Sequence, residues 1–449
     1  MALGCALVAA LLGPAAVAEC AKLPPAVPDR VGRAQLQVTK IADKTRIQGL
    51  IDIIWTDYFY KPGWAKTPGI YSIKYMTAAR DPNPNAAAGP DPNSDHASRD
   101  LGWYLRNRPD WIVYKCPGEP PPSLCRHGLL PDSPATPAFD CFFSNSVDYV
   151  PLDTSNPDVR EFLFDANLGG PPSAPPFPAY LSPRGPVRIF SNLLASGLYD
   201  AVGVDNLGAH NNFGRCGIYR QGAFLGKFSG KPVDPLFISE QIEWLSWLRR
   251  RVNAAGGCLA GNDYFESGDP AGFLQLADSL DIVLDEHGFT RNNKPMETGA
   301  AWRTRIDTYL RLTASGKPLI IVDYLPRGEE ATLATRYAAG AAWSLANYLL
   351  IKGDRTYLAL TTEGDIGQEG ITRLVPPAFA ETGRALEPVR TDSRLHWRRF
   401  EHALAIVNPT AEPGWFDLGP TRWRGYDGAA LSGLIDVAAG TALVLVPDT

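Results

Sequence analysis

Acidic residues directly follow short apolar runs at several places in this 449-residue sequence. Asp205 comes after the run at 202–204, and Asp285 and Glu286 come after the run at 282–284. The other acids in equivalent positions are Asp57, Asp263, Asp323 and Asp354. In a barrel of parallel strands, the carboxyl ends of all strands meet on one rim, where the active sites of this architecture lie. Acids far apart in the sequence would then converge on one site.

Two neighbouring carboxylates suit the cleavage of a glycosidic bond, because one can attack the anomeric carbon while the other protonates the leaving oxygen. Asp205 follows the fourth apolar run and Glu286 the sixth, so a common rim would bring this pair together. We expect Asp205 to be the nucleophile and Glu286 the general acid/base, with Asp285 as the alternative for the second role. A single acid at a strand end is more often a helix cap or an ion-pair partner, so the hypothesis depends on several acids together.

Polar and aromatic residues near the same run ends are expected to bind the substrate. Sugar hydroxyls form hydrogen bonds with polar side chains, and the apolar faces of sugar rings stack on aromatic rings. The expected substrate-binding residues are Asp57, Tyr58, Lys74, Asn206, Asn262, Tyr264, Asp285, Asp323 and Tyr324. Structural alternatives stay open: turn formation for the asparagines, an ion pair for Lys74, and ordinary packing for the aromatic rings.

Eight short runs rich in Ile, Val and Leu could form the strands that carry these residues. Runs that are apolar at every position suit parallel strands buried on both faces. The runs are residues 51–55, 70–76, 111–114, 201–204, 258–260, 282–284, 319–322 and 348–351. Strands alternating with helices predict a doubly wound sheet or a (β/α)8 TIM barrel, and about eight such units favour the barrel. No Gly-x-Gly-x-x-Gly segment follows a strand, which argues against dinucleotide binding.

The stretches 235–254, 302–312 and 331–349 have helical periodicity. After about residue 385, short strand-like segments alternate with Gly, Pro and Asp turns. This change predicts a small antiparallel β domain. We therefore expect a catalytic barrel in residues 30–380 and a C-terminal β-sandwich-like domain in residues 385–449.

Residues 1–18 are predicted to be a secretory signal peptide, because they are almost purely apolar and end in Ala-Val-Ala at Ala18. Cleavage near Ala18 would release a secreted or periplasmic protein with six cysteines, and this even number suggests disulfides. Cys116, Cys125 and Cys141 lie close together in the sequence, so a local bridge among them is expected.

The composition excludes several other classes of protein. The net charge is -5 and no basic stripe occurs, so nucleic acid is not an expected partner. No later segment is apolar enough for stable membrane insertion. The six histidines lack metal-binding spacings, and neither a Gly-x-Ser-x-Gly elbow nor a phosphate-binding loop occurs. We expect no cofactor and no metal, and the sequence leaves the oligomeric state undefined.

Several segments resemble a known group of enzymes. Residues 199–207 (Tyr-Asp-Ala-Val-Gly-Val-Asp-Asn-Leu) are similar to the fourth-strand motif of the endo-α-1,4-polygalactosaminidase and hypothetical glycoside-hydrolase-like families. Residues 110–114, 152–160 and 281–286 resemble further segments of these families, and the resemblance spans roughly 47–352. It implies a barrel related to melibiase-like enzymes, with catalytic carboxylates on strands four and six. The Pro-rich segments 116–141 and 171–178 depart from the family pattern and leave the substrate undefined.

Together, the residues and the resemblance predict a secreted glycoside hydrolase acting on an oligo- or polysaccharide. One alternative is a non-catalytic glycan-binding barrel that keeps the binding residues without the chemistry. A further alternative is a metal-dependent hydrolase. The sugar, the linkage and the stereochemical outcome are not defined by the sequence.

Overall fold

The computed structural model covers the chain from residue 1 to residue 449 and describes most of its regular elements. The described residues are 20, 22–36, 48–56, 67–77, 80–81, 108–116, 150–168, 181–182, 185–186, 199–211, 214–266, 268–291, 294–295, 297–325, 338–362 and 374–448. The expected Asp57, Tyr58, Cys125, Cys141 and signal peptide lie outside these ranges.

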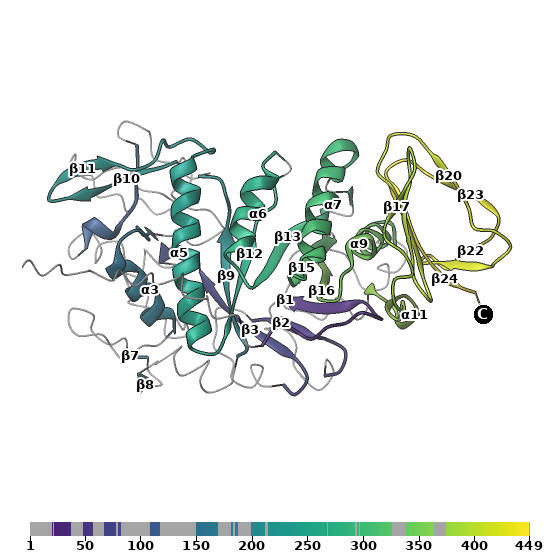
Figure 1. Ribbon diagram of the computed structural model, residues 1–449, viewed down its shortest axis with the longest axis horizontal. Coiled ribbons are helices and arrows are strands. Elements are labelled where there is room, and N and C mark those ends of the chain that lie inside the picture. Colours follow the sequence, from purple (N-terminus) through teal and green to yellow (C-terminus); the bar gives the residue numbers. More distant parts are fainter. Residues whose placement is uncertain are drawn as a thin grey trace, which may run out of the picture.

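Eight parallel strands close into a barrel at the centre of the molecule (Figure 1). Their spatial order is β12-β9-β3-β2-β1-β16-β15-β13, and pairing of β12 with β13 closes the ring. The strands are β1 (Gly32–Leu36), β2 (Ile53–Trp55), β3 (Tyr71–Thr77), β9 (Ala201–Leu207), β12 (Cys258–Asp263), β13 (Ile282–Arg291), β15 (Leu319–Leu325) and β16 (Thr356–Thr362). The predicted barrel is confirmed.

Two of the eight predicted barrel strands are wrong. Residues 111–114 lie in a 3-10 turn, η2 (Pro109–Trp111), and in strand β5 (Tyr114–Lys115) of a different sheet. Residues 348–351 are the last turn of helix α9 (Ala338–Ile351), which is apolar nearly all round because the barrel and the C-terminal sheet both cover it. The two barrel strands that the sequence analysis did not predict are β1 and β16. In chain order, β9, β12, β13 and β15 are strands four to seven of the barrel, as predicted. One wrong strand was predicted before them in place of β1, and one after them in place of β16.

Strand alternation fills the barrel interior with one set of side chains. The interior cluster includes Ile53, Ile73, Ala201 and Ile282, while the residues next to them in each strand face the helices. Trp55 also lies in this interior. A Cβ added at Gly203 would lie 2.5 Å from the Trp55 ring, so the glycine makes room for the indole.

Helices cover the outside of the barrel (Figure 1). They are α3 (Pro157–Leu168), α5 (Pro235–Ala254), α6 (Pro270–Asp278), α7 (Gly299–Ala314), α9 and the short α11 (Pro377–Ala380). The predicted helix at 235–254 matches α5, and 302–312 lies within α7. The Asp234 carboxylate accepts hydrogen bonds from the amides of Leu236 and Phe237, which fixes the start of α5. Among the described helices, none is long and apolar enough to cross a membrane.

The segment after the predicted signal peptide packs against the amino end of the barrel. Cys20 forms a disulfide with Cys258 at the start of β12, with a Cα–Cα distance of 5.1 Å. The Lys352 ammonium donates to the carbonyl oxygens of Val27 (2.7 Å) and Pro28 (3.0 Å). These contacts close the end of the barrel opposite to Asp205 and Glu286.

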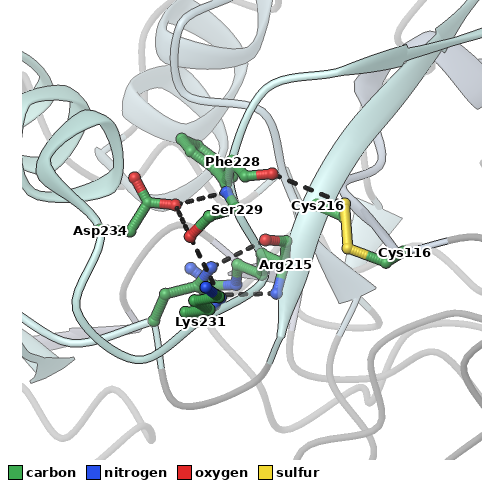
Figure 2. Close-up of a disulfide and its surroundings, with 8 residues drawn as sticks. Cys116, Arg215, Cys216, Phe228, Ser229, Lys231 and Asp234 are labelled. Carbon is green, nitrogen blue, oxygen red and sulfur yellow. Dashed lines mark hydrogen bonds between the residues drawn. A yellow bond between two sulfur atoms is a disulfide. The ribbon is translucent and has the colours of Figure 1, made fainter.

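A small three-stranded sheet lies outside the barrel and contains β5, β10 (Arg215–Arg220) and β11 (Ala223–Gly226). A second disulfide joins Cys116 to Cys216, so Cys116 takes no part in the local bridge expected among Cys116, Cys125 and Cys141, and the other two cysteines lie outside the described residues (Figure 2). Figure 2 also shows Asp234 accepting a hydrogen bond from the hydroxyl of Ser229 at 2.8 Å, which links this sheet to the start of α5.

The chain ends in a separate set of antiparallel strands (Figure 1, yellow). A six-stranded sheet has the order β17-β18-β19-β24-β21-β22, and β20 pairs with β23. The strands are β17 (Arg390–Thr391), β18 (His396–Arg399), β19 (Leu404–Asn408), β20 (Gly414–Asp417), β21 (Trp423–Gly425), β22 (Ala430–Leu431), β23 (Leu434–Val437) and β24 (Thr441–Pro447). The predicted small antiparallel β domain is confirmed. Outside it, the short elements are β4 (Arg80–Asp81), β6 (Val150–Pro151), β7 (Leu181–Ser182), β8 (Gly185–Pro186) and β14 (Lys294–Pro295).

His396 lies where the C-terminal sheet meets α7, and we expect it to make the protein sensitive to acid. Its ring centroid is 4.5 Å from that of Trp302, and its Nε2 is 3.3 Å from the Arg303 guanidinium. Burial, together with Arg303, lowers the pKa of His396 from 6.5 to about 4. The unfolded chain therefore binds this proton more readily, and stability present above pH 6.5 is lost as the pH falls towards 4.

Urea unfolding of the wild type and of His396→Gln at pH 7.5, 6 and 4.5 would measure this effect. The wild type should lose up to about 3 kcal/mol more than the variant between pH 7.5 and 4.5. Equal losses in the two proteins would show that His396 does not cause the acid sensitivity.

Candidate active site

Asp205 lies near the carboxyl end of β9, and Glu286 lies where the regular pairing of β13 with β15 ends. Both are on the interior side of the barrel wall. In β9 the interior positions are Ala201, Gly203 and Asp205, and in β13 they are Ile282, Leu284 and Glu286. The two strands flank β12, which carries Asn262 at its own carboxyl end. Three consecutive strands thus bring three polar side chains to one place on the rim.

The side-chain amide of Asn262 connects the two carboxylates. Its Nδ2 donates to Asp205 Oδ1 at 2.7 Å and to Glu286 Oε2 at 2.8 Å. The sum of these distances, 5.5 Å, is the largest separation that the two acceptor oxygens can have. The sequence prediction that Asp205 and Glu286 would meet is therefore matched by the geometry.

Both strands become irregular at the carboxylates. Between β9 and β12 the register shifts after Val204, so that Asp205 and Asn206 together face Asn262. Asn206 has a φ of 58°, in the left-handed region that Asn tolerates better than most residues. The ladder between β13 and β15 also shifts after Glu286. Such bulges redirect side chains and are common next to active sites.

Further donors converge on each carboxylate. Asp205 Oδ2 accepts hydrogen bonds from Tyr75 Oη at 2.9 Å and from Asn206 Nδ2 at 2.7 Å. Glu286 Oε1 accepts one from Tyr324 Oη at 2.6 Å. Among the described residues, Asp205 therefore has three donors and Glu286 has two. Tyr75 was not among the sequence candidates, although its place in β3, two residues after the interior Ile73, indicates an inward side chain.

Burial raises the pKa of Glu286, and the nearby Asp205 raises it further. The hydrogen bonds from Tyr324 and Asn262 act in the opposite direction without cancelling these effects. A carboxyl group that keeps its proton to a higher pH than usual is suited to general acid catalysis.

Asp285 and Asp323 do not face this site, so their predicted substrate-binding role is wrong, as is the alternative of Asp285 as the acid/base. Both occupy strand positions that point towards the helices, and they are 1% and 0% exposed. Asp285 accepts hydrogen bonds from Arg305 (3.2 Å) and Tyr309. Asp323 accepts them from the amides of Phe289 and Thr290, at 2.7 and 3.0 Å, and from the Ser344 hydroxyl.

The predicted substrate-binding role of Lys74 is also wrong. It stands between Ile73 and Tyr75, which face the interior, so alternation directs its side chain towards the helices, where it is 1% exposed. Tyr264, in contrast to Lys74, is accessible to a ligand, because its side chain is 41% exposed and follows β12 directly. Asn206 and Tyr324 contact the carboxylates directly.

His210, which follows β9, contacts two acidic side chains that follow β12. Its Nδ1 is 2.6 Å from Glu266 Oε2, and its Nε2 is 3.3 Å from Asp269 Oδ2. Asp269 in turn caps α6 by accepting a hydrogen bond from the Gly272 amide. These contacts anchor the segment that follows Asn262 to the segment that follows β9. Within the described ranges, no three His, Cys, Asp or Glu side chains are grouped closely enough to hold a metal ion.

Comparisons with known proteins relate this architecture to that of glycoside hydrolases. No family model matches the chain, and no curated protein matches its sequence. A structure described as a family GH13_31 enzyme is 11% identical, with a TM-score of 0.50, over 94% of this chain and 99% of that one. A Flavobacterium johnsoniae GH31 dextranase complexed with glucose is 11% identical, with a TM-score of 0.45, over 94% of this chain and 52% of that one. The likeness to the GH13_31 enzyme shows a common fold.

Proposed function

We propose that this protein is a glycoside hydrolase that cleaves an oligo- or polysaccharide with Asp205 and Glu286. The observation that carries the proposal is the pair of rim carboxylates held within 5.5 Å of each other by the Asn262 amide. Two carboxyl groups at this spacing are the machinery of glycosidic-bond hydrolysis. The barrel shared with the GH13_31 enzyme agrees with this function.

The hydrogen bonds and the burial of the two carboxylates support a different proposed role for each. Three donors stabilise negative charge on Asp205, which suits the nucleophile. Glu286, with its raised pKa, suits the acid. Asp205 would form a bond to the anomeric carbon while the glycosidic C–O bond breaks and the Glu286 proton passes to the leaving oxygen. Water would then attack the same carbon, release Asp205 and return a proton to Glu286.

The short separation predicts retention of configuration at the anomeric carbon. Retaining enzymes hold their carboxyl groups about 5–5.5 Å apart, whereas inverting enzymes leave about 6.5–9.5 Å for a water molecule. Proton NMR of the first products, recorded before mutarotation, should show the anomer of the substrate. Formation of the opposite anomer would mean that water attacks directly and that Asp205 is a base.

We also propose that the protein acts outside the cytoplasm, after cleavage near Ala18. The Cys20–Cys258 and Cys116–Cys216 disulfides support this, because such bonds persist mainly in oxidising compartments. The sequencing of the amino terminus of protein recovered from the exported fraction would test it. A terminus at Met1 would contradict the signal peptide.

Measurement of reducing ends released from a glycan panel tests the function itself. The panel contains galactosaminogalactan, α-galactans, α-glucans and bacterial exopolysaccharides, each incubated with the purified exported protein. Release from one glycan supports the proposal and gives its substrate class. Tight binding to a glycan without any release would favour the non-catalytic glycan-binding barrel, and release abolished by a chelator would favour the metal-dependent hydrolase.

A further inference from the structure

Asn262 occupies an unusual position for a residue that was expected to bind sugar. Its side chain is 5% exposed and lies between the two carboxylates. Both of its N–H bonds are used, one for each carboxylate. Its Oδ1 is buried, so the amide offers a sugar hydroxyl no accessible polar atom.

The orientation of this amide is fixed by charge. If the amide were turned over, Oδ1 would face one oxygen of each carboxyl group at less than 3 Å, and while both groups are ionised all three oxygens would repel one another. In the present orientation Oδ1 has no hydrogen-bond partner within the described parts of the chain. A buried acceptor without a partner is destabilising, because it has lost its hydrogen bonds to water and gained none in return. Among the described residues, Oδ1 of Asn262 thus accepts no hydrogen bond in this orientation, while Nδ2 donates one to each carboxylate.

We propose that Asn262 is a positioning residue that fixes the distance between Asp205 and Glu286 through the two hydrogens of one nitrogen. The proposal rests on the proposed function and deepens it. Without these hydrogens, the two carboxylates, less than 6 Å apart, would repel each other and move apart whenever both are ionised. The planar amide holds one oxygen of each group in a fixed direction, as a double displacement requires.

The same contacts single out the attacking atom. Asp205 Oδ2 already accepts two hydrogen bonds, from Tyr75 and Asn206, whereas Oδ1 accepts only the one from Asn262 among the residues that the structure describes. Oδ1 therefore keeps more of its lone-pair density available and faces Glu286 across the amide. Asn262 thus places Oδ1 of Asp205, which accepts fewer hydrogen bonds than Oδ2, next to Glu286, the proposed acid for the same glycosidic bond.

Two substitutions of nearly equal size separate this role from substrate binding. Asn262→Leu removes both donors without adding charge, and Asn262→Asp replaces the donors by a third carboxyl group. Asn408→Leu is the matched control, since Asn408 is 0% exposed and its Nδ2 donates to the carbonyls of Glu412 (2.8 Å) and Val437 (2.9 Å) in the C-terminal domain. Thermal unfolding identifies any general loss of stability.

For a positioning residue, Asn262→Leu should lower kcat about 100-fold, the cost of a displacement of roughly 1 Å, and leave KM within about twofold. Asn262→Asp should move the alkaline limb of the kcat/KM profile upward by about one pH unit, because the added negative charge favours the protonated form of Glu286. Asn408→Leu should change neither kinetic value. A raised KM with unchanged kcat in Asn262→Leu would instead make Asn262 a substrate-binding residue and overturn the proposal.

A direct titration distinguishes failure of this inference from failure of the proposed function. Carbon-13 NMR of glutamate-labelled protein, with the Glu286 resonance assigned by its absence in Glu286→Gln, follows this carboxyl group without any substrate. An upward shift of its midpoint in Asn262→Asp supports the contact even if no glycan is cleaved. An unchanged midpoint rejects Asn262 as the link, even if the wild type is an active hydrolase.

Discussion

Replacement of Asp205 by Asn should reduce glycan hydrolysis at least about 10⁴-fold, because an amide cannot form the covalent bond to the anomeric carbon. The variant keeps the shape of the side chain and should still fold. One amide orientation sets its NH2 group against Asn262 Nδ2, and the other sets it against Tyr75 and Asn206, so at least one hydrogen bond is lost. The measurement is reducing-end release on the glycan cleaved by the wild type.

A companion variant, Glu286→Gln, separates the two proposed roles. It should also lose activity on the natural glycan, where the leaving alkoxide needs a proton. On an aryl glycoside of the same sugar, whose phenolate leaves without protonation, the first step should proceed almost normally in Glu286→Gln. Asp205→Asn should stay inactive on both substrates. If Asp205→Asn retained more activity than Glu286→Gln on the aryl glycoside, the roles would have to be exchanged.

The sequence predicted the carboxylate pair because the apolar runs around it are typical of buried parallel strands. The run at 282–284 is apolar at every position, and Glu286 lies two residues after Leu284, on the same face of the strand. The two errors occurred where this pattern is ambiguous. A run of four apolar residues can be a strand or one turn of a buried helix, and residues 348–351 are the helix.

The two missing strands lacked the expected composition for physical reasons. β1 carries Arg33 and Gln35 at alternate positions, and these polar residues break the continuous apolar run on which the strand prediction relied. Their side chains form hydrogen bonds inside the protein, from Arg33 to the Leu50 carbonyl at 3.4 Å and from Gln35 to the Leu36 carbonyl at 2.7 Å. β16 begins and ends with threonine, which packs well in strands, but only two of its seven residues are Ile, Val or Leu, so it does not stand out in a search for these residues.

The direction of each side chain was the harder problem for the sequence. Asp285 and Glu286 are neighbours, yet one faces helix α7 and the other faces the site. Alternation separates such neighbours only when the register of the strand is known, and bulges at Asp205 and after Glu286 change the register just where the site begins. Similarly, the contacts of Asn262 with both carboxylates depend on these bulges and have no signature in the sequence.

Replacement of Arg305 by Met should destabilise the protein by about 3–5 kcal/mol, because it removes one partner of a buried ion pair. The guanidinium is 2% exposed and pairs with the 1% exposed Asp285 at 3.2 Å and with Glu297 at 2.8 Å. Methionine would fill the space against Phe265 but would leave Asp285 as an uncompensated buried charge. Asp263 is also buried, and neither of its carboxylate oxygens has a hydrogen-bond partner in the described structure. Asp263 therefore adds a second buried carboxyl group that acts on Asp285 and supplies no compensating charge.

The pH dependence gives this prediction a second, independent test. Burial raises the pKa of Asp285 to about 6, and Arg305 limits this rise, so Arg305→Met should raise the pKa further. A carboxyl group with a raised pKa in the folded state is stable while protonated and loses this stability as the pH rises through the folded value. Urea unfolding should therefore show a larger deficit for Arg305→Met at pH 8 than at pH 5.

Arg251→Met is the matched control, because Arg251 is 43% exposed and pairs with the 48% exposed Glu161 at 2.9 Å. An exposed pair contributes at most about 1 kcal/mol, and its loss should not depend on pH in this way. The double variant Arg305→Met/Asp285→Asn should recover part of the stability, since it removes the charge that Arg305 compensates. If the double variant were less stable than Arg305→Met at pH 8, the cost would come from lost packing against Phe265 and Tyr309 and not from the uncompensated charge of Asp285.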